Sequence, residues 1–164
     1  MLYRKAIFHD VEEIYTLVAH YAGTGEMLAR SRNTLYETLR DMVVAVDEEG
    51  HVRGVGGLHI IWDRLAEVRT MAVDPACTRQ GIGAEIVKRL VAEGRALGVE
   101  KIFTLTYKPG FFQKQGFVTV TKDDLPHKVW KECLDCPKFP NCDEIAMVLP
   151  WENYEKELKK ISMR

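Results

Sequence analysis

A switch of hydrophobic period around a glycine-rich turn constrains the fold of this chain more than any other feature of its sequence. Residues 65–73, LAEVRTMAV, have the composition of a strand, and the turn ACTRQGIGAE follows at 76–85. From Gly81 onwards apolar residues recur at helical spacing as far as Leu97, and KIFTLTY at 101–107 is again strand-like. A strand, a helix and a second strand in this order form a crossover unit, so the two strands are predicted to be parallel neighbours.

The remaining strands are predicted to pair mostly in antiparallel fashion. Further strand-like runs lie at 2–8, 42–47, 51–61, 116–122 and 144–149. Further helices are expected from Asp10 to the GTG at 23–25, across 33–42, at 109–115 and at 152–160. We therefore expect a single α/β (α+β) domain over residues 1–164, with a mixed, mostly antiparallel central sheet of about six to seven strands flanked by helices.

The charge balance argues against nucleic acid as a partner. The chain has 23 basic and 24 acidic residues, 46% hydrophobic residues and a formal net charge of −1. No window resembles a signal peptide or a membrane span of about 18 apolar residues. We expect a cytoplasmic chain that binds small molecules, neither nucleic acid nor membrane, and that could form a homodimer through an exposed sheet edge.

The glycine turn has the features of a phosphate site. Gly81 and Gly83 would let a ligand approach the backbone, and the first N–H groups of the following helix have no partner within that helix. These donors and the helix dipole attract a diphosphate, and Arg79 adds a positive charge. A tight helix cap without a ligand is the alternative interpretation, because short glycine patterns recur by chance.

The segment MAVDPACTRQGIGAEIVKRL and the order of the predicted elements resemble the GNAT acetyltransferase superfamily over nearly the whole chain. The resemblance implies the GNAT-like acyl-CoA N-acyltransferase fold, with acetyl-CoA as cosubstrate. The positions that correspond to pantetheine contacts are Met71 and Val73, and those that correspond to phosphate contacts are Arg79, Gln80, Gly81, Ile82, Gly83 and Ala84. Thr78 stands where the family usually has Arg or Gln, so Arg79 is expected to supply that charge.

Several segments are more closely similar to the short, single-domain bacterial N-acetylglutamate synthases. The clearest is LPHKVWKECLDCPKFPNCDEIAM at 125–147, and TLTYKPGFFQKQGF at 104–117 is another. This resemblance implies transfer of the acetyl group from acetyl-CoA to the amino group of L-glutamate, the first step of arginine biosynthesis, by direct transfer in a ternary complex. Larger synthases have an added amino-acid-kinase-like domain that this sequence does not include, so regulation by that route is not implied.

Two alternatives to a glutamate acetyltransferase stay open. A chain of the same fold could acetylate another amino acid, an amine or a protein N-terminus. A chain of a different class could bind acetyl-CoA without turnover and contact a partner through its cysteine-containing loop. Release of CoA with glutamate, with other amines or with neither would separate these cases.

Acetyl transfer to an amine needs an oxyanion donor, a base and a site for the acceptor. The backbone N–H of Ala72 or Val73 is the expected oxyanion donor. Glu67 and Arg69 project from one strand face, so we expect Glu67 to take the amine proton through water and Arg69 to bind a carboxylate. Pairing of Glu67 with Arg53 across the sheet is the alternative. Further candidate cations for the substrate are Arg30, Arg32 and Lys128.

The leaving thiolate lacks the acid that this superfamily often supplies. The family pattern F-Y-x-x-x-G-F appears here as FFQKQGF, so Phe112 stands in the place of the tyrosine. Tyr107, at the end of the preceding strand, is the nearest substitute, with packing as a core aromatic as the alternative. The thiolate could also leave without any protein acid.

The irregular segment 122–143 contains three of the four cysteines. They follow the spacing C-x2-C-x5-C, and with one histidine they would suit tetrahedral zinc: Cys133, Cys136, Cys142 and His127. Thiols packed as small hydrophobes, or a disulfide between two of them, are the alternatives, so no metal is assigned. Cys77, in the glycine turn, is expected to be a spectator, because direct transfer from a thioester needs no acyl-enzyme.

Overall fold

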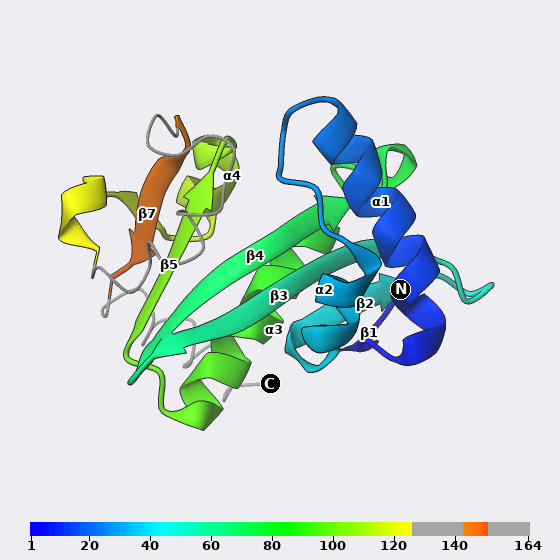
Figure 1. Cartoon of the computed structure of the whole chain (residues 1–164), viewed down its shortest axis with the longest axis horizontal. Helices are drawn as coiled ribbons and strands as arrows, with labels where there is room; N and C mark the ends of the chain where they lie inside the picture. The colour runs from blue at the N-terminus through cyan, green and yellow to red at the C-terminus, as the bar shows by residue number, and fades with distance from the viewer. Residues whose placement is uncertain (126–142, 151–164) are drawn as a thin grey trace.

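The computed structural model describes residues 1–125 and 143–150, which form a seven-stranded sheet in the order β1-β2-β3-β4-β5-β7-β6 (Figure 1). The strands are β1 (Leu2–Lys5), β2 (Met42–Val46), β3 (Val52–Trp62), β4 (Leu65–Val73), β5 (Lys101–Thr106), β6 (Val118–Thr119) and β7 (Ile145–Leu149). Only β4 and β5 pair in parallel among these strands, and the other neighbours are antiparallel. The predicted mixed, mostly antiparallel sheet and its parallel crossover are confirmed.

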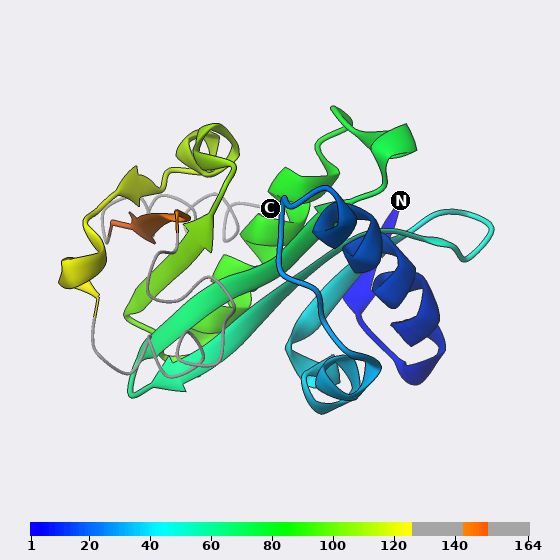
Figure 2. The same cartoon turned by 45° about the horizontal axis from the view of Figure 1, so that its top comes forward.

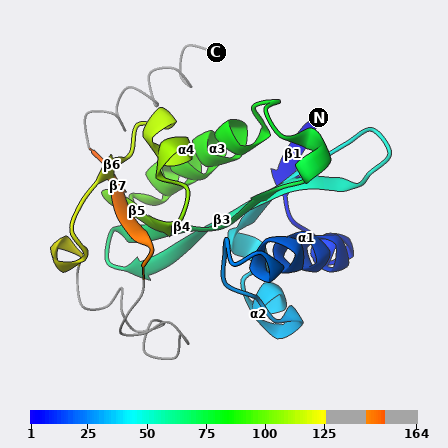
Figure 3. The ribbon, with the colours of Figure 1, turned by 90° about the horizontal axis from the view of Figure 1, so that it is seen from above.

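Helices cover both faces of the sheet. The α-helices are α1 (Val11–Gly23), α2 (Arg32–Glu37), α3 (Ile82–Leu97) and α4 (Pro109–Lys114), and the 3-10 helices are η1 (Phe8–Asp10), η2 (Leu39–Asp41), η3 (Pro75–Cys77) and η4 (Lys122–Asp124). Figure 3 shows α1 and α2 on one side of the sheet and α3 and α4 on the other. Figure 2 shows α1 and α2 side by side over the same strands. Within the described ranges no helix has the length and apolar character needed to cross a bilayer.

Several element ends differ from the sequence prediction because short-range hydrogen bonds end the elements early. The first strand stops at Lys5, since the Asp10 carboxylate accepts the backbone N–H of Ile7 at 2.8 Å and closes a 3-10 turn. The helix expected across 33–42 ends at Glu37 and gives way to η2. The charged helix expected at 152–160 lies outside the described residues.

The alternation of side chains along the strands explains why both faces are buried. In β2, Val43 and Ala45 pack with the α3 side of the core, whereas Val44 and Val46 pack with the α1 side. Successive strand residues point to opposite faces, so an all-apolar strand fits between two layers of helices. In β4 the same rule directs Ala66 and Val68 towards α3 and leaves Glu67 and Arg69 for the opposite face. After the bulge, Met71 and Val73 pack on the α3 side and Ala72 on the α1 side.

Close contact between α3 and the sheet depends on a glycine in β3. A β-carbon built on Gly56 would lie 2.7 Å from Cγ2 of Ile86 and 3.3 Å from Cδ1 of Leu90. A larger residue at this position would therefore displace the Met71 side chain, its nearest neighbour, and push α3 away from the strands. Helix α3 begins directly after the glycine turn.

We predict that Gly56→Ala lowers the free energy of unfolding by about 1–3 kcal/mol through overpacking against α3. Gly23→Ala is the matched control, because a β-carbon there meets nothing within 4 Å and the helix favours alanine. Urea or thermal unfolding of the two variants measures the difference. Equal stability of the two variants would show that α3 does not pack at the distance described.

Candidate active site

The parallel strands β4 and β5 separate after a short paired stretch. Their register pairs Leu65 with Lys101, Ala66 with Ile102 and Glu67 with Phe103, and it extends no further. The hydroxyl of Thr104 donates to the carbonyl of Val68 at 2.9 Å, so a side chain takes the place of the next ladder bond. Beyond that point the two strands diverge, as Figure 1 shows, and backbone groups of β4 face the opening between them.

A bulge in β4 lies beside this opening. The register with β3 pairs Gly57 with Arg69 and Val55 with Ala72, so two residues of β4, Thr70 and Met71, stand opposite one of β3. Thr70 has a φ of 59°, in the left-handed region that a β-branched residue rarely adopts. Because strained backbone and bulges concentrate next to functional sites, this position makes the end of β4 a candidate site.

The hydrogen bonds at the end of β4 show which peptide groups face the opening. The N–H of Asp74 donates to the carbonyl of Arg53 at 2.8 Å, so Asp74 faces β3. The carbonyl of Val73 instead accepts the hydroxyl of Tyr21 at 2.5 Å, on the opposite side. Peptide groups alternate in direction along a strand, so the N–H of Val73 is directed at the opening and that of Ala72 at β3. Burial, together with Glu26 and Asp74, raises the pKa of Tyr21.

The turn between β4 and α3 is held by a carboxylate and an arginine. Asp74 accepts the backbone N–H of Ala76 at 2.9 Å, and this bond, with Arg53 at 2.9 Å, lowers the pKa of Asp74. Arg53 also bonds Asp47 at 2.7 Å, so it joins the β2–β3 turn to the start of the glycine turn. Asp74 therefore remains a carboxylate at neutral pH and fixes the path of the chain into η3.

The two glycines of the turn have different reasons to be glycine. Gly81 is the N-cap of α3 with a φ of 77°, and a β-carbon there would meet no atom within 4 Å. A β-carbon on Gly83 would instead lie 3.0 Å from the ring of Phe111 in α4, so Gly83 provides room for packing between two helices. Both glycines were expected to leave room for a ligand. The surroundings of Gly81 are open, as that prediction requires, whereas the space beside Gly83 is filled by Phe111.

The start of α3 presents backbone donors that the helix does not use. The carbonyl of Gly81 accepts the N–H of Glu85 at 3.0 Å, so the three preceding amides, of Ile82, Gly83 and Ala84, have no partner within the helix. Gly81 makes no side-chain cap bond to them. Arg79, with a φ of 65°, is exposed next to this helix start. The fit of this segment to a diphosphate rests on these donors and on the helix dipole.

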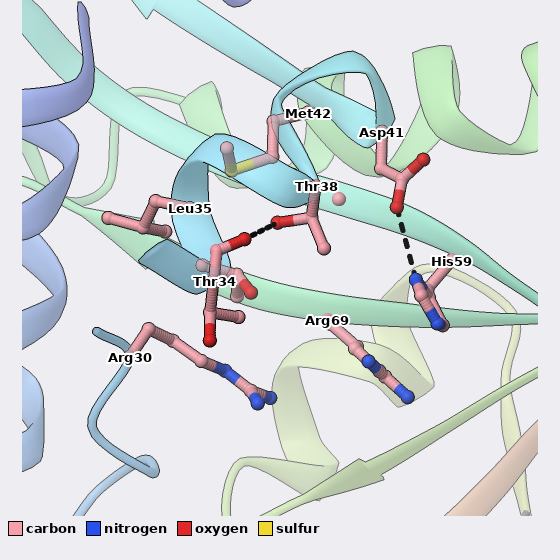
Figure 4. Close-up of a pocket in the computed structure, with 10 residues that line it drawn as sticks. Arg30, Thr34, Leu35, Thr38, Asp41, Met42, His59 and Arg69 are labelled. Carbon is pink, nitrogen blue, oxygen red and sulfur yellow. Dashed lines mark hydrogen bonds and ion pairs between the residues drawn. The ribbon is translucent and has the colours of Figure 1, made fainter. Parts of the chain in front are cut away.

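A pocket lies on the other face of the sheet, over β3 and β4. About 330 Å³, counting its open mouth, is enclosed by Arg30, Thr34, Leu35, Thr38, Asp41, Met42, Gly57, His59, Arg69 and Thr70. Figure 4 shows the side chains of Arg30, Arg69 and His59 reaching this space from different segments. Since Thr70 is also the strained bulge residue, the pocket adjoins the part of β4 that faces the strand opening.

The structure brings the two predicted charged residues of β4 together. Nε of Arg69 donates to Oε1 of Glu67 at 2.6 Å, and each side chain is 11% exposed. Arg53 is bound to Asp47 and Asp74, so the pairing of Glu67 with Arg53 that we weighed is wrong. The Glu67 carboxylate orients the guanidinium that lines the pocket.

The predicted arginines before and within α2 have different places. Arg30 lines the pocket, and it has no carboxylate partner in the part of the chain that the structure describes. Arg32 instead bonds Glu12 at 2.8 and 3.1 Å and stacks 4.0 Å from the ring centre of Tyr15. The structure therefore places Arg30, and not Arg32, next to Arg69.

The aromatic residues after β5 divide into one at the surface and one in the core. The hydroxyl of Tyr107 donates to Oδ1 of Asp143 at 2.6 Å. Phe112 is 4% exposed and packs edge to face on Phe111 and Phe117. Of the two, Tyr107 alone offers a polar group near the mouth of the strand opening, where Lys108 also pairs with Glu26 at 3.3 Å.

Two pocket residues, Asp41 and His59, were not predicted from the sequence to belong to a functional site. His59 lies in an ordinary strand-like run and Asp41 in a segment predicted to be helical, and neither belongs to a motif. The period-2 rule alone could have placed His59 on the face of Gly57. The predicted Lys128, His127, Cys133, Cys136 and Cys142 lie outside the described residues; within those residues no group of three or more metal-ligating side chains occurs.

Known proteins similar to this chain agree with the geometry. The Acetyltransferase (GNAT) family matches residues 7–117. An uncharacterized N-acetyltransferase from Chlorobaculum tepidum is 39% identical over 145 residues, which are 88% of this chain and 93% of the relative. An amino-acid acetyltransferase from Mycobacterium tuberculosis is 40% identical over 131 residues, which are 79% of this chain and 75% of the relative.

Solved structures share the fold over most of the chain. The crystal structure of Rv2747 from Mycobacterium tuberculosis in complex with CoA and NLQ has a TM-score of 0.80 at 36% identity, over 91% of this chain and 98% of that chain. N-acetylglutamate synthase from Neisseria gonorrhoeae, complexed with coenzyme A and N-acetyl-glutamate, has a TM-score of 0.81 at 22% identity, over 90% of this chain and 34% of that chain. The second likeness shows the fold alone.

The separated strands, the uncapped helix start and these matches lead to one conclusion. Because the family match spans residues 7–117 and two relatives are 39% and 40% identical over most of the chain, this protein belongs to the GNAT family of acetyltransferases and is an N-acetyltransferase.

Proposed function

We propose that this chain transfers the acetyl group of acetyl-CoA to the amino group of L-glutamate, giving N-acetyl-L-glutamate as the first step of arginine biosynthesis in the cytoplasm. The observation that carries the proposal is the convergence of Arg30 and Arg69 in one pocket beside the bulge at Thr70. The relative named amino-acid acetyltransferase supports an amino acid as acceptor.

Two guanidinium groups suit an acceptor with two carboxylates. Arginine binds a carboxylate with two parallel hydrogen bonds, and its fork geometry selects for that group. Arg69 is oriented by Glu67 at 2.6 Å, whereas Arg30 has no carboxylate partner within the described residues. A half-buried cation without a counter-ion is stabilised when an anionic ligand arrives. We therefore assign one substrate carboxylate to Arg69 and the other to Arg30, and Lys128 remains a further candidate.

The acetyl-CoA site is proposed next to the pocket, where β4 ends after the bulge at Thr70. Its pantetheine arm would follow Met71, Ala72 and Val73 between the separated strands. Its phosphates would meet the turn and helix start formed by Arg79, Gln80, Gly81, Ile82, Gly83 and Ala84. Of the two predicted oxyanion donors we assign the N–H of Val73, because the Val73 carbonyl that accepts Tyr21 lies on the side of the opening and the N–H and C=O of one strand residue point the same way. One such donor contributes about 3–4 kcal/mol to acyl transfer.

Two residues are predicted to transfer protons, Tyr107 and Glu67. We propose that Tyr107, whose hydroxyl donates to Asp143, gives its proton to the leaving thiolate, and that a proton lost from the amine nitrogen restores the hydroxyl through water. Glu67 was predicted to be the base acting through water. Its Oε1 already accepts Arg69, so we propose that Glu67 chiefly positions that arginine.

A thiol-release assay with all twenty amino acids tests the acceptor. Release of CoA that depends on glutamate supports the proposal, whereas release with another amine would transfer the assignment to that amine. Tight binding of acetyl-CoA without release would favour a non-catalytic binding module. Light scattering on the same sample tests whether the chain forms a homodimer.

We predict that Arg30→Ala raises the KM for glutamate about 10- to 100-fold, because one charge-assisted bond pair is worth about 1.5–3 kcal/mol. Arg32→Ala is the matched control, since Arg32 is bound to Glu12 on the helix surface and does not line the pocket. Initial rates at varied glutamate and at saturating acetyl-CoA measure both. An equal rise in KM for the two variants would contradict the assignment, as would a rise confined to acetyl-CoA.

We predict that Gly81→Ala weakens acetyl-CoA binding, whereas Gly98→Ala does not. Gly81 caps the start of α3 and Gly98 caps its end, both with left-handed backbones, φ 77° and 87°. Each alanine should therefore lower the free energy of unfolding by a similar amount, about 1 kcal/mol. Only Gly81 lies at the proposed phosphate site. Calorimetric titration with CoA gives the affinities and thermal melting gives the stabilities; unchanged CoA affinity in Gly81→Ala would place the phosphates elsewhere.

A further inference from the structure

The pocket contains an acidic residue and a histidine that no step above uses. Nδ1 of His59, in β3, lies 3.0 Å from Oδ2 of Asp41, the last residue of η2 (Figure 4). The two side chains are about equally exposed, 30% for His59 and 33% for Asp41. Both line the pocket beside Arg30 and Arg69.

The register of β3 and β4 places the imidazole beside the proposed acceptor site. His59 stands opposite Glu67, and Gly57 stands opposite Arg69. Because Gly57 has no side chain, the face of the sheet is open between His59 and Arg69, and Gly57 itself lines the pocket. In the part of the chain that the structure describes, the second ring nitrogen of His59, Nε2, has no hydrogen-bonding partner.

We propose that Asp41 and His59 form the base that removes a proton from the acceptor's ammonium group. This inference rests on the proposed function. When Asp41 accepts the Nδ1–H, the neutral ring keeps its lone pair on Nε2, and the carboxylate stabilises the imidazolium that forms. His59 is then the residue that meets the substrate, and Asp41 is a positioning residue that fixes the tautomer.

The charges of the pocket then match all the charged groups of the acceptor. Arg30 and Arg69 face the two carboxylates, and the Asp41–His59 pair faces the ammonium. Glu67 is the competing base on this face, but its Oε1 accepts Nε of Arg69 at 2.6 Å. His59 has no such bond at Nε2 within the described residues.

The proton balance of the step is simple. An N–H bond of the ammonium breaks, an H–Nε2 bond forms, and the amine lone pair attacks the thioester carbon. The C–N bond forms, the C–S bond breaks, and the CoA thiolate takes a proton from Tyr107. The second proton lost from nitrogen replaces it on the Tyr107 hydroxyl through water. Nε2 returns its proton to solvent before the next turnover.

We expect His59→Gln in the full-length chain to lower kcat about 10²- to 10³-fold at pH 7. The loss should shrink as pH rises, because a larger share of the acceptor is then already a free amine. The acidic limb expected in the kcat/KM profile of the unaltered protein should give way, in His59→Gln, to a rise with pH that follows the acceptor amine. Among the described residues, the other charged groups facing His59 are Asp41 of η2, Glu67 and Arg69 of β4 and Arg30 before α2. Glu67→Gln is therefore run in parallel and should keep the acidic limb.

His51→Gln provides the matched control, because His51 is exposed just before β3 and outside the pocket. It should keep full activity. The acceptor used is whichever amine the twenty-amino-acid assay identifies, so a wrong assignment of glutamate leaves this test intact. A kcat within about threefold of the unaltered protein in His59→Gln, or loss of the acidic limb in Glu67→Gln instead, would overturn the proposal.

Nitrogen NMR of the His59 imidazole tests the pair without any turnover. The neutral ring should carry its proton on Nδ1, and Asp41→Asn should shift the population towards the Nε2–H tautomer. N-acetyl-L-glutamate or the product of the identified acceptor should perturb the Nε2 signal. A neutral ring protonated on Nε2 in the unaltered protein would exclude its role as the proton acceptor.

Discussion

The separation of β4 from β5 after three paired residues is the constraint on which the rest of the structure depends. A parallel pair that continued would use the backbone groups of β4 in the ladder and leave none for a ligand. Thr104 ends the pairing by donating to Val68, and the bulge at Thr70 turns the following residues of β4. The N–H of Val73 is thereby directed into the opening.

The two sides of the opening are built independently. On one side, Arg53 and Asp74 hold the turn that leads to α3, and Gly56 lets α3 approach the sheet closely enough to bring its start to the end of β4. On the other side, α2 and η2 cover β3 and β4 and leave the pocket that Arg30 and His59 line. The strained residue Thr70 belongs to both, so the proposed cofactor and acceptor sites meet at the bulge.

The parts of this arrangement that could be predicted from sequence are those with a local signal. The change from strand to helix period located β4, α3 and β5, and alternation placed Glu67 and Arg69 on one face. The change of period at Gly81 located the start of α3, where Gly81 is the N-cap. Residue type and spacing along one element were sufficient for each of these predictions.

The parts that were missed depend on register between distant segments. Nothing near Arg32 in the sequence indicates that Glu12, twenty positions earlier, takes its guanidinium, and nothing near Gly83 indicates that Phe111 fills the space beside it. The contact between Asp41 and His59 needs η2 to end where β3 passes, eighteen positions later. Such contacts follow from strand pairing and helix packing, which a single sequence does not specify locally.

Amide hydrogen exchange measured by NMR, with and without CoA, tests the central claim most directly, because it reports on individual backbone donors. The account predicts that CoA slows exchange and shifts the signals at Val73 in β4 and at Ile82, Gly83 and Ala84 in α3. It also predicts little change at Gly98, at the far end of the same helix. Unchanged amides at Val73 and the start of α3, with protection elsewhere in the chain, would contradict it.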